Sequence, residues 1–379
     1  MAEKRKGAST GQKFLGLAAG MGAGVVLGIM LVRILDMNAI AQMSPGEFAL
    51  SYGLLIVVLA LALLLQLIIH EAGHLVFGLA TGYGFSSFRI GSLMLQRVGE
   101  TFRVRRLSIP GTGGQCLMIP PGSPDKPYPV VLYNLGGVIA NLVTAALASV
   151  LVPLCGGNRT LVGFLAGLCF FGIALALVNG IPQRGAAVPN DGWNALNLHK
   201  NELARRSLWV QLAVSGRLNQ GERMRDMPNE WFVLPEGADL SNVLVSTLAV
   251  FEENRLVDQH DFEGALRACE RLLAAEVGAP QMYVALLACD LVFCQLVLGL
   301  EPEVSRLEEQ ATAALLRQMR DNPSVLRTQY ALALLVDGDK AKAASIRAEF
   351  DKIARSYPAE VDITLERELM ALAQERLLH

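Results

Sequence analysis

Two histidines and a glutamate occupy one short segment in the first quarter of the chain, His70-Glu71-Ala72-Gly73-His74. On a helix, residues i and i+4 lie on one face, so both imidazoles can bind one Zn²⁺ ion with Glu71 beside them. Zinc lowers the pKa of a bound water toward ~7, and a glutamate at this position can take the proton and pass it to a leaving amine. The pattern predicts metal-dependent peptide hydrolysis, with His70 and His74 as metal ligands and Glu71 as the general base.

The five-residue motif is short enough to occur by chance, so its surroundings decide the interpretation. The chain has five histidines in 379 residues, and two of them stand in this segment. The segment directly follows the apolar run Phe48–Ile69, and ionisable residues within a membrane span are costly and usually functional. A merely polar helix end or a structural metal site would be the alternatives. We favour the catalytic interpretation.

A third protein ligand is needed, because catalytic zinc sites combine three protein ligands with a water. Asp191, in Asn190-Asp191-Gly192, follows the last apolar run and is expected at the depth of the two histidines. The alternative is that Asn-Asp-Gly simply forms a turn. The rival ligands are His199, in a polar segment leaving the membrane, and Asp125, in a proline-rich stretch before the third apolar run. We predict that Asp191 completes the site.

The composition divides the chain into two parts. Hydrophobic residues make up 52% and charged residues 18%, with a mean hydropathy of +0.38. Average soluble domains are about 45–50% apolar and about 25% charged. Residues 1–200 carry a net charge of +7 and the remainder −9. We therefore expect an apolar, basic membrane half and an acidic, soluble half. The six cysteines show no paired spacing that would indicate a disulfide framework or a thiolate metal site.

Four apolar runs are long enough to cross a bilayer core of ~30 Å. They are Phe14 to about Leu35, Phe48–Ile69, about Val130–Leu154 and about Leu161–Ile181. The first follows a basic start, and we interpret it as a retained anchor rather than a cleaved signal peptide. Lys and Arg are concentrated at the amino terminus, in the 83–128 connector and after the last run. The positive-inside rule then predicts that both termini and this connector are cytoplasmic.

The expected fold is mainly α, a polytopic membrane protein with about four transmembrane helices. Within the cytoplasmic connector, alternating residues near Ser87–Ile90 and Thr101–Arg105 predict a few short strands. Beyond residue 240, the segments that begin at Asp261 and Gly338 are similar to tetratricopeptide helices. Their spacing gives no clean 34-residue period. The C-terminal cytoplasmic helical domain is therefore either tetratricopeptide-like or an irregular bundle.

The motifs and apolar runs define four regions. The predicted regions are 1–48 for the anchor and external connector, 49–195 for a metalloprotease core, 196–239 for a linker and 240–379 for the helical domain.

Three motifs on three successive apolar runs resemble those of the site-2 protease family of intramembrane metalloproteases. That family carries HExxH on its first core helix, a G-P-x-x-N-type motif on the second, and N-x-x-P followed by D-G on the third. The corresponding segments here are His70–His74, Gly137–Asn141, and Asn179–Pro182 with Asp191-Gly192. The chain departs from the pattern at Val138, where proline is frequent, at Asn190, where an apolar residue is usual, and in a longer stretch before Asp191.

The resemblance implies that Asn141 and Asn179 help to bind substrate, although buried asparagines in spans also serve as interhelical hydrogen-bonding groups. It also implies that an edge of the strand-containing connector pairs with an unwound substrate. We therefore expect a Zn²⁺-dependent protease, multi-pass in a bacterial cell membrane. Its substrate would be a membrane-anchored protein or a peptide precursor. We expect contact with the lipid bilayer, a protein partner at the helical domain, and no nucleic acid.

Two other functions compete with proteolysis. One is a proteolytically inactive membrane scaffold that presents the helical domain, and the other is a metal-transporting membrane protein. The intact His70, Glu71 and His74 argue against the scaffold. A transporter would carry ionisable residues on several spans, whereas here they cluster at one depth.

Overall fold

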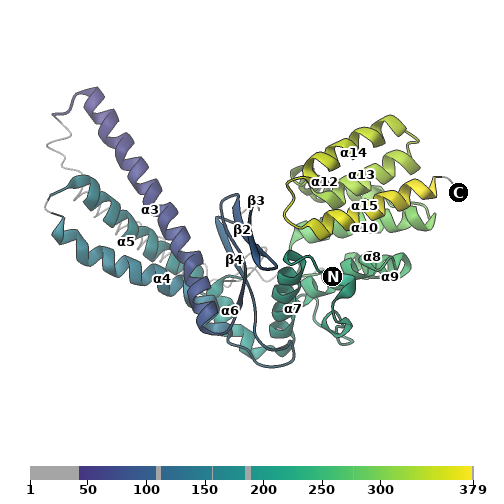
Figure 1. The fold of residues 1–379 in the computed structure, drawn as a ribbon, viewed down its shortest axis with the longest axis horizontal. Coiled ribbons are helices and arrows are strands. Elements are labelled where there is room, and N and C mark those ends of the chain that lie inside the picture. The colour runs from purple at the N-terminus through teal and green to yellow at the C-terminus, as the bar shows by residue number, and fades with distance from the viewer. Residues whose placement is uncertain (1–41, 108–111, 156, 184–188, 276, 378–379) are drawn as a thin grey trace, which may run out of the picture.

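The computed structural model describes residues 42–107, 112–155, 157–183, 189–275 and 277–377. In this part, an arm of three long helices and a domain of shorter helices lie on either side of a small sheet (Figure 1). The chain is mainly helical, as the sequence predicts. The first apolar run, Phe14 to about Leu35, lies outside the described residues, and the anchor stays a prediction.

The arm consists of α3 (Pro45–Ala80), α4 (Val130–Leu151, extended by a 3₁₀ turn to Leu154) and α5 (Arg159–Gly180). All three pack against one another. At the start of α3, Ser44 and Glu47 form a reciprocal capping box. The sequence places the histidine motif at the end of this helix, whereas α3 continues to Ala80 because no proline or capping signal interrupts it.

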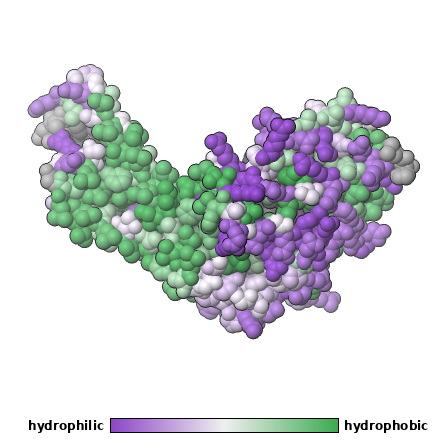
Figure 2. Space-filling model, in the orientation of Figure 1, coloured by the Kyte–Doolittle hydropathy of each residue, from purple (hydrophilic) through white to green (hydrophobic). Residues whose placement is uncertain are grey.

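Four of the described helices are long and apolar enough to cross a membrane: α3, α4, α5 and α10 (Gln281–Leu298). This agrees with a membrane protein. Three of the four match predicted spans, but α10 does not. The most apolar window of α10 is 61% buried inside the protein, against 17% for α3, and α10 packs against neighbouring helices of its own domain. We therefore interpret α10 as a core helix, and Figure 2 shows the hydrophobic surface concentrated on the arm.

The connector between α3 and α4 forms a four-stranded antiparallel sheet, which confirms the predicted strands. Its strand order is β3-β2-β1-β4. The strands are β1 (Gly84–Ile90), β2 (Leu93–Val98), β3 (Thr101–Arg106) and β4 (Gly114–Ile119). The edge strand β4 lies against α3 on one side and α7 on the other, so it joins the sheet to the arm.

The stretch 196–239, expected to be a linker, contributes to the core that covers the sheet. It holds α7 (Glu202–Asn219) and short 3₁₀ turns at Leu198–Lys200, Met224–Asp226 and Asn229–Trp231. Trp209 of α7 is buried and donates a hydrogen bond to the Pro121 carbonyl at 3.0 Å. Its ring meets Trp231 edge-to-face, with the centroids 5.1 Å apart.

The second half of the chain forms the helical domain, whose helices pack against one another on the far side of the sheet from the arm (Figure 1). Its helices are α8 (Val243–Asp258), α9 (Phe262–Ala274), α10, α11 (Ser305–Glu308), α12 (Gln310–Gln318), α13 (Pro323–Leu335), α14 (Lys340–Ala354) and α15 (Glu360–Arg376). A helical domain is confirmed, and its relation to tetratricopeptide repeats stays a prediction. Glu360 at the start of α15 pairs with Arg103 at 2.8 Å and with Arg105, which ties the domain to the edge strand β3.

A buried arginine connects three helices of this domain. Arg327 of α13 donates a hydrogen bond to Asp290 of α10 at 2.6 Å and lies 3.6 Å from Glu366 of α15. Its guanidinium also lies 4.3 Å from the centre of the Phe293 ring. A charge taken out of water is tolerated only with such partners. The core therefore depends on all members of this group being present.

We expect Arg327→Met to destabilise the domain by about 3–5 kcal/mol, because it leaves two buried carboxyl groups without their cation. Hydrogen exchange of the α10 and α13 amides in the full-length protein in detergent would measure the loss. Arg347→Met is the control, since the Arg347–Asp351 pair is partly exposed and is expected to contribute less than about 1 kcal/mol. Equal exchange in the two variants would contradict the structural role of Arg327.

Candidate metal centre

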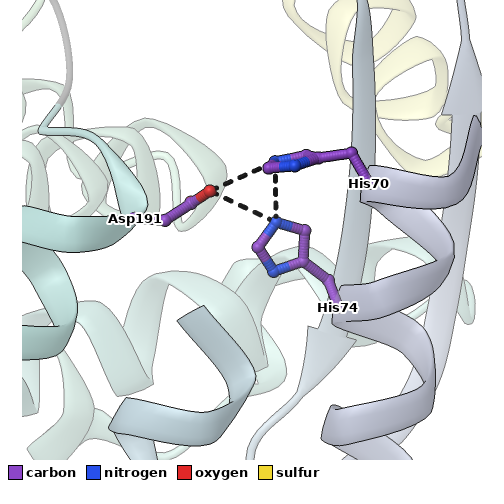
Figure 3. A group of neighbouring side chains, drawn as sticks. All are labelled: His70, His74 and Asp191. Carbon is purple, nitrogen blue, oxygen red and sulfur yellow. Dashed lines mark hydrogen bonds and ion pairs between the residues drawn. The ribbon is translucent and has the colours of Figure 1, made fainter. Parts of the chain in front are cut away.

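The structure brings His70, His74 and Asp191 together, although Asp191 is more than a hundred residues away along the chain (Figure 3). The two Nε2 atoms are 3.2 Å apart, and they lie 3.2 and 3.4 Å from Oδ2 of Asp191. Donors around a tetrahedral ion with bonds of about 2.0–2.1 Å are about 3.3 Å apart. The three atoms therefore have the spacing of three corners of one coordination tetrahedron. Both histidines are buried, and the Asp191 side chain is 23% exposed.

The two rival ligands lie elsewhere. His199 is exposed on the 3₁₀ turn after α6 (Asp191–Asn197). Asp125 is exposed and pairs with Arg206 at 3.0 Å. Among the described residues, only the predicted trio forms a group of at least three His, Cys, Asp or Glu side chains that could hold a metal.

Each histidine is oriented by a hydrogen bond from its other ring nitrogen. Nδ1 of His70 lies 2.7 Å from Oδ1 of Asn141, and Nδ1 of His74 lies 2.8 Å from the carbonyl oxygen of Tyr133. Both partners are acceptors, so the proton belongs on Nδ1 in each ring. The lone pair of each Nε2 then points toward Asp191, as in metal sites with such outer partners.

Asn141 is itself held by Gln66. Its Nδ2 donates to Oε1 of Gln66 at 2.6 Å and to the Gln66 carbonyl at 2.9 Å, and Gln66 donates to the Leu168 carbonyl at 2.7 Å. Neither amide side chain is exposed. The chain of bonds thus runs from α5 through α3 and α4 to the metal-binding turn. The sequence analysis missed Gln66, although a lone amide one turn before His70 in an apolar run was a readable signal.

The two predicted substrate-binding asparagines differ in position. Asn141 contacts His70, whereas Asn179 is half-buried and donates to the carbonyl of Leu175 in its own helix at 3.0 Å. The Asn179 carbonyl oxygen would lie 3.1 Å from a Cβ at Gly192, so its main chain borders the residue after Asp191. Substrate binding by either asparagine stays a prediction.

Glu71 faces the sheet rather than the lipid side of α3. Its carboxylate interacts with the backbone N–H of Cys116 in β4. A Cβ atom at Gly114 would stand 2.6 Å from Oε1 of Glu71, so a larger residue there would require the glutamate side chain to shift. Tyr133 of α4 donates to the Cys116 carbonyl at 3.0 Å, which fixes β4 above the glutamate. Nothing in the sequence pattern marks Cys116, because its backbone makes the contact.

Glycines allow α3 and α4 to approach closely at the histidines. A Cβ at Gly73 would come within 2.3 Å of the Gly136 carbonyl oxygen, and one at Gly137 within 2.6 Å of the His70 ring. Any larger residue would push the helices apart or displace the imidazole. The motif Gly137–Asn141 thus places both a glycine and an amide against His70.

Asn190 and Gly192 position Asp191. The Asn190 side chain accepts hydrogen bonds from the backbone N–H groups of Gln183 and Trp193, both at 3.0 Å. It donates to the carbonyls of Val178 at 2.8 Å and Ile181 at 2.6 Å.

The bonds to Val178, Ile181 and Gln183 clamp the start of α6 to the end of α5, and the bond from Trp193 N–H caps α6 itself. Gly192 makes the approach possible, because a Cβ there would lie 2.0 Å from the Gly180 carbonyl oxygen. Asn190 stands where site-2 proteases usually have an apolar residue, and its side-chain bonds hold Asp191 in place.

No family of known proteins, no curated protein and no solved structure matches this chain. The resemblance to site-2 proteases therefore rests on the motifs alone.

We expect Asp191→Ala to weaken metal binding more than about 100-fold, because it removes a ligand. Loss of a residue that only hydrogen-bonds to a ligand typically costs about 10–100-fold in affinity. Competition with a chromophoric chelator, using Zn²⁺ and Co²⁺, would measure the affinity. His199→Ala should leave the affinity unchanged. The reverse result would place the third ligand at His199.

The substitution Asn190→Asp distinguishes the two roles of Asn190, which accepts hydrogen bonds from backbone N–H groups and donates hydrogen bonds to carbonyls at the end of α5. An aspartate still accepts the two N–H bonds but cannot donate to the Val178 and Ile181 carbonyls, so we expect Asp191 to shift and metal affinity to fall about 10–100-fold. The Co²⁺ absorption spectrum should change as well. Asn158→Asp is the matched control, since Asn158 caps α5 through Leu161 N–H at 3.1 Å, far from the site. Wild-type affinity and spectrum in Asn190→Asp would show that the cap alone suffices.

Proposed function

We propose that this protein is a zinc-dependent intramembrane protease of the site-2 type, with His70, His74 and Asp191 holding the ion. Two imidazole nitrogens and one carboxylate oxygen are a ligand set of catalytic zinc sites, and they leave a fourth position open. The donor spacings of 3.2 to 3.4 Å fit such an ion. When bound there, zinc would lower the pKa of a water toward ~7 and polarise the scissile carbonyl.

The observation that carries the proposal is that apolar side chains of α3 are exposed on both sides of the site along the helix. Large apolar side chains remain exposed past the histidines: Val76 is 60% and Leu79 53% exposed. Before the histidines, Leu61 and Leu64 are exposed as well. Apolar surface of this kind on both sides of a buried polar site is expected where lipid surrounds the helix. A peptide bond that reaches the site would therefore lie in or next to a membrane segment.

The residues of the chain have separate tasks in this reaction. Glu71 takes a proton from the attacking water and delivers it to the leaving amine. Asn141 and the Tyr133 carbonyl keep the His70 and His74 rings in the tautomer that presents Nε2. The clamp at Asn190 keeps the Asp191 carboxylate opposite them.

The sheet offers a way to present an extended substrate. β4 is the last strand of the sheet, and its Gly114–Cys116 segment passes directly beside Glu71. A segment added along the outer edge of β4 would be held by main-chain hydrogen bonds to residues other than Cys116, whose N–H and carbonyl already bond to Glu71 and Tyr133. Such addition requires local unwinding of a helical substrate, which fits glycine-containing or polar spans best.

The proposed substrate is a membrane-anchored protein or a peptide precursor, and the proposed setting is a bacterial cell membrane with both termini cytoplasmic. An inactive scaffold would not require the metal-binding geometry, the two oriented histidines and Glu71 to be kept together. We therefore do not favour it.

Glu71→Gln should retain the metal and the fold but lose cleavage of a model single-span substrate in liposomes by at least about 10²-fold, because it removes only proton transfer. Glu100→Gln, in the exposed turn between β2 and β3, is the control and should remain active. Activity of Glu71→Gln within about threefold of wild type would rule out this role.

A further inference from the structure

The helical domain contains a cavity of about 420 Å³ between α10, α12 and α13. Leu307, Leu316 and Val325 supply apolar lining, and Cys289 and Thr328 line it from α10 and α13. The Thr328 hydroxyl bonds to the carbonyls of Cys289 at 3.2 Å and Ser324 at 3.0 Å. The wall is therefore held in shape by the helices that carry the buried Arg327 group.

One wall of the cavity is incompletely covered. No residue of α12 is fully buried, although the helix is amphipathic and turns Ala313 and Leu316 toward the cavity. The volume lies within the range of pockets that bind ligands, ~300–1,000 Å³. The cavity can therefore take up one or two large apolar side chains.

The rim of the cavity is positive, although the domain around it is acidic. Arg317 and Arg320 line it from the end of α12, one turn apart, and no acidic side chain is among its lining residues. Within the described residues, Arg317 has no carboxylate partner, and Arg320 meets only its neighbour Asp321 at 3.8 Å. The chain beyond residue 200 has 19 basic and 28 acidic residues. Two arginines, one of them without a carboxylate partner among the described residues, are thus concentrated at the cavity.

The chemistry favours a peptide over a small anion. Exposed arginine–carboxylate pairs contribute little each, about 0–1 kcal/mol, so a small anion held by these two side chains would bind weakly. A peptide adds the burial of an apolar side chain and several further polar contacts, including the exposed amide of Gln329. Arginine groups beside apolar pockets are a common means of recognising acidic motifs.

We propose that this cavity binds an acidic linear peptide segment of a partner protein, with one apolar side chain inserted between α12 and α13 and carboxylates on Arg317 and Arg320. The site is separate from the metal centre, and it goes beyond the proposed protease function.

A selection on the intact protein tests the proposal. Full-length protein in detergent, carrying Glu71→Gln to prevent cleavage, is presented to a randomised library of 12-residue peptides. Enriched peptides should combine several Asp or Glu residues with a Leu, Ile or Phe. Fluorescence anisotropy of a labelled enriched peptide should show about tenfold weaker binding to the double variant Arg317→Ala, Arg320→Ala. The matched control, Arg267→Ala with Arg271→Ala on the exposed face of α9, should bind normally.

Each other outcome overturns the proposal. No enrichment, or enrichment of peptides without an acidic excess, would show that the cavity does not recognise such segments. Equal loss in both double variants would indicate general attraction between charges. Binding of anionic phosphatidylglycerol vesicles that depends on Arg317 and Arg320, without peptide binding, would assign the arginines to a lipid surface. Because cleavage plays no part in these measurements, their failure would leave the protease proposal untouched.

Discussion

The arrangement of the turn that carries His70 and His74 follows from one constraint: every polar group placed among apolar helices must find its partner within the protein. An unpaired buried donor or acceptor costs about 1–3 kcal/mol, and in hydrocarbon no water can replace the missing partner. The turn meets this requirement through a continuous chain of bonds. The Asn141 side chain donates a hydrogen bond to Gln66 and accepts one from His70, and the Tyr133 carbonyl accepts one from His74. The same bonds that remove the desolvation cost also fix the orientation of both rings.

This constraint also explains why glycines concentrate here. Hydrogen bonds between side chains of neighbouring helices require the helices to be close, and Gly73 and Gly136 let the α3 and α4 backbones touch. Gly192 does the same for the approach of α6 to the end of α5. The packing distance between the helices, the hydrogen bonds and the positions of His70, His74 and Asp191 therefore depend on one another. A change in any of them alters the other two.

The sequence predicted the parts of the structure that depend on local pattern. Helical spacing placed His70 and His74 on one face, and Asp191, which follows an apolar run, lies beside them in the structure. Alternating residues located β1 and β3. Partners across helices were harder, since neither the Gln66 bonds nor the contact of Cys116 with Glu71 leaves a periodic signal. Length and hydropathy alone do not separate a span from a core helix: α10 meets both criteria, although the sequence analysis did not count it as a span.

The four-stranded sheet has a different partner at each edge. At one edge, β3 is paired through Arg103 and Arg105 with Glu360 of the helical domain, and at the other, β4 lies on Glu71. Main-chain pairing joins β3 to β2, β2 to β1 and β1 to β4, with one irregularity between Phe85 and Ser87 in the last pair. A shift of β3 relative to the arm would have to pass through three strand pairings before it reached β4, the strand beside Glu71.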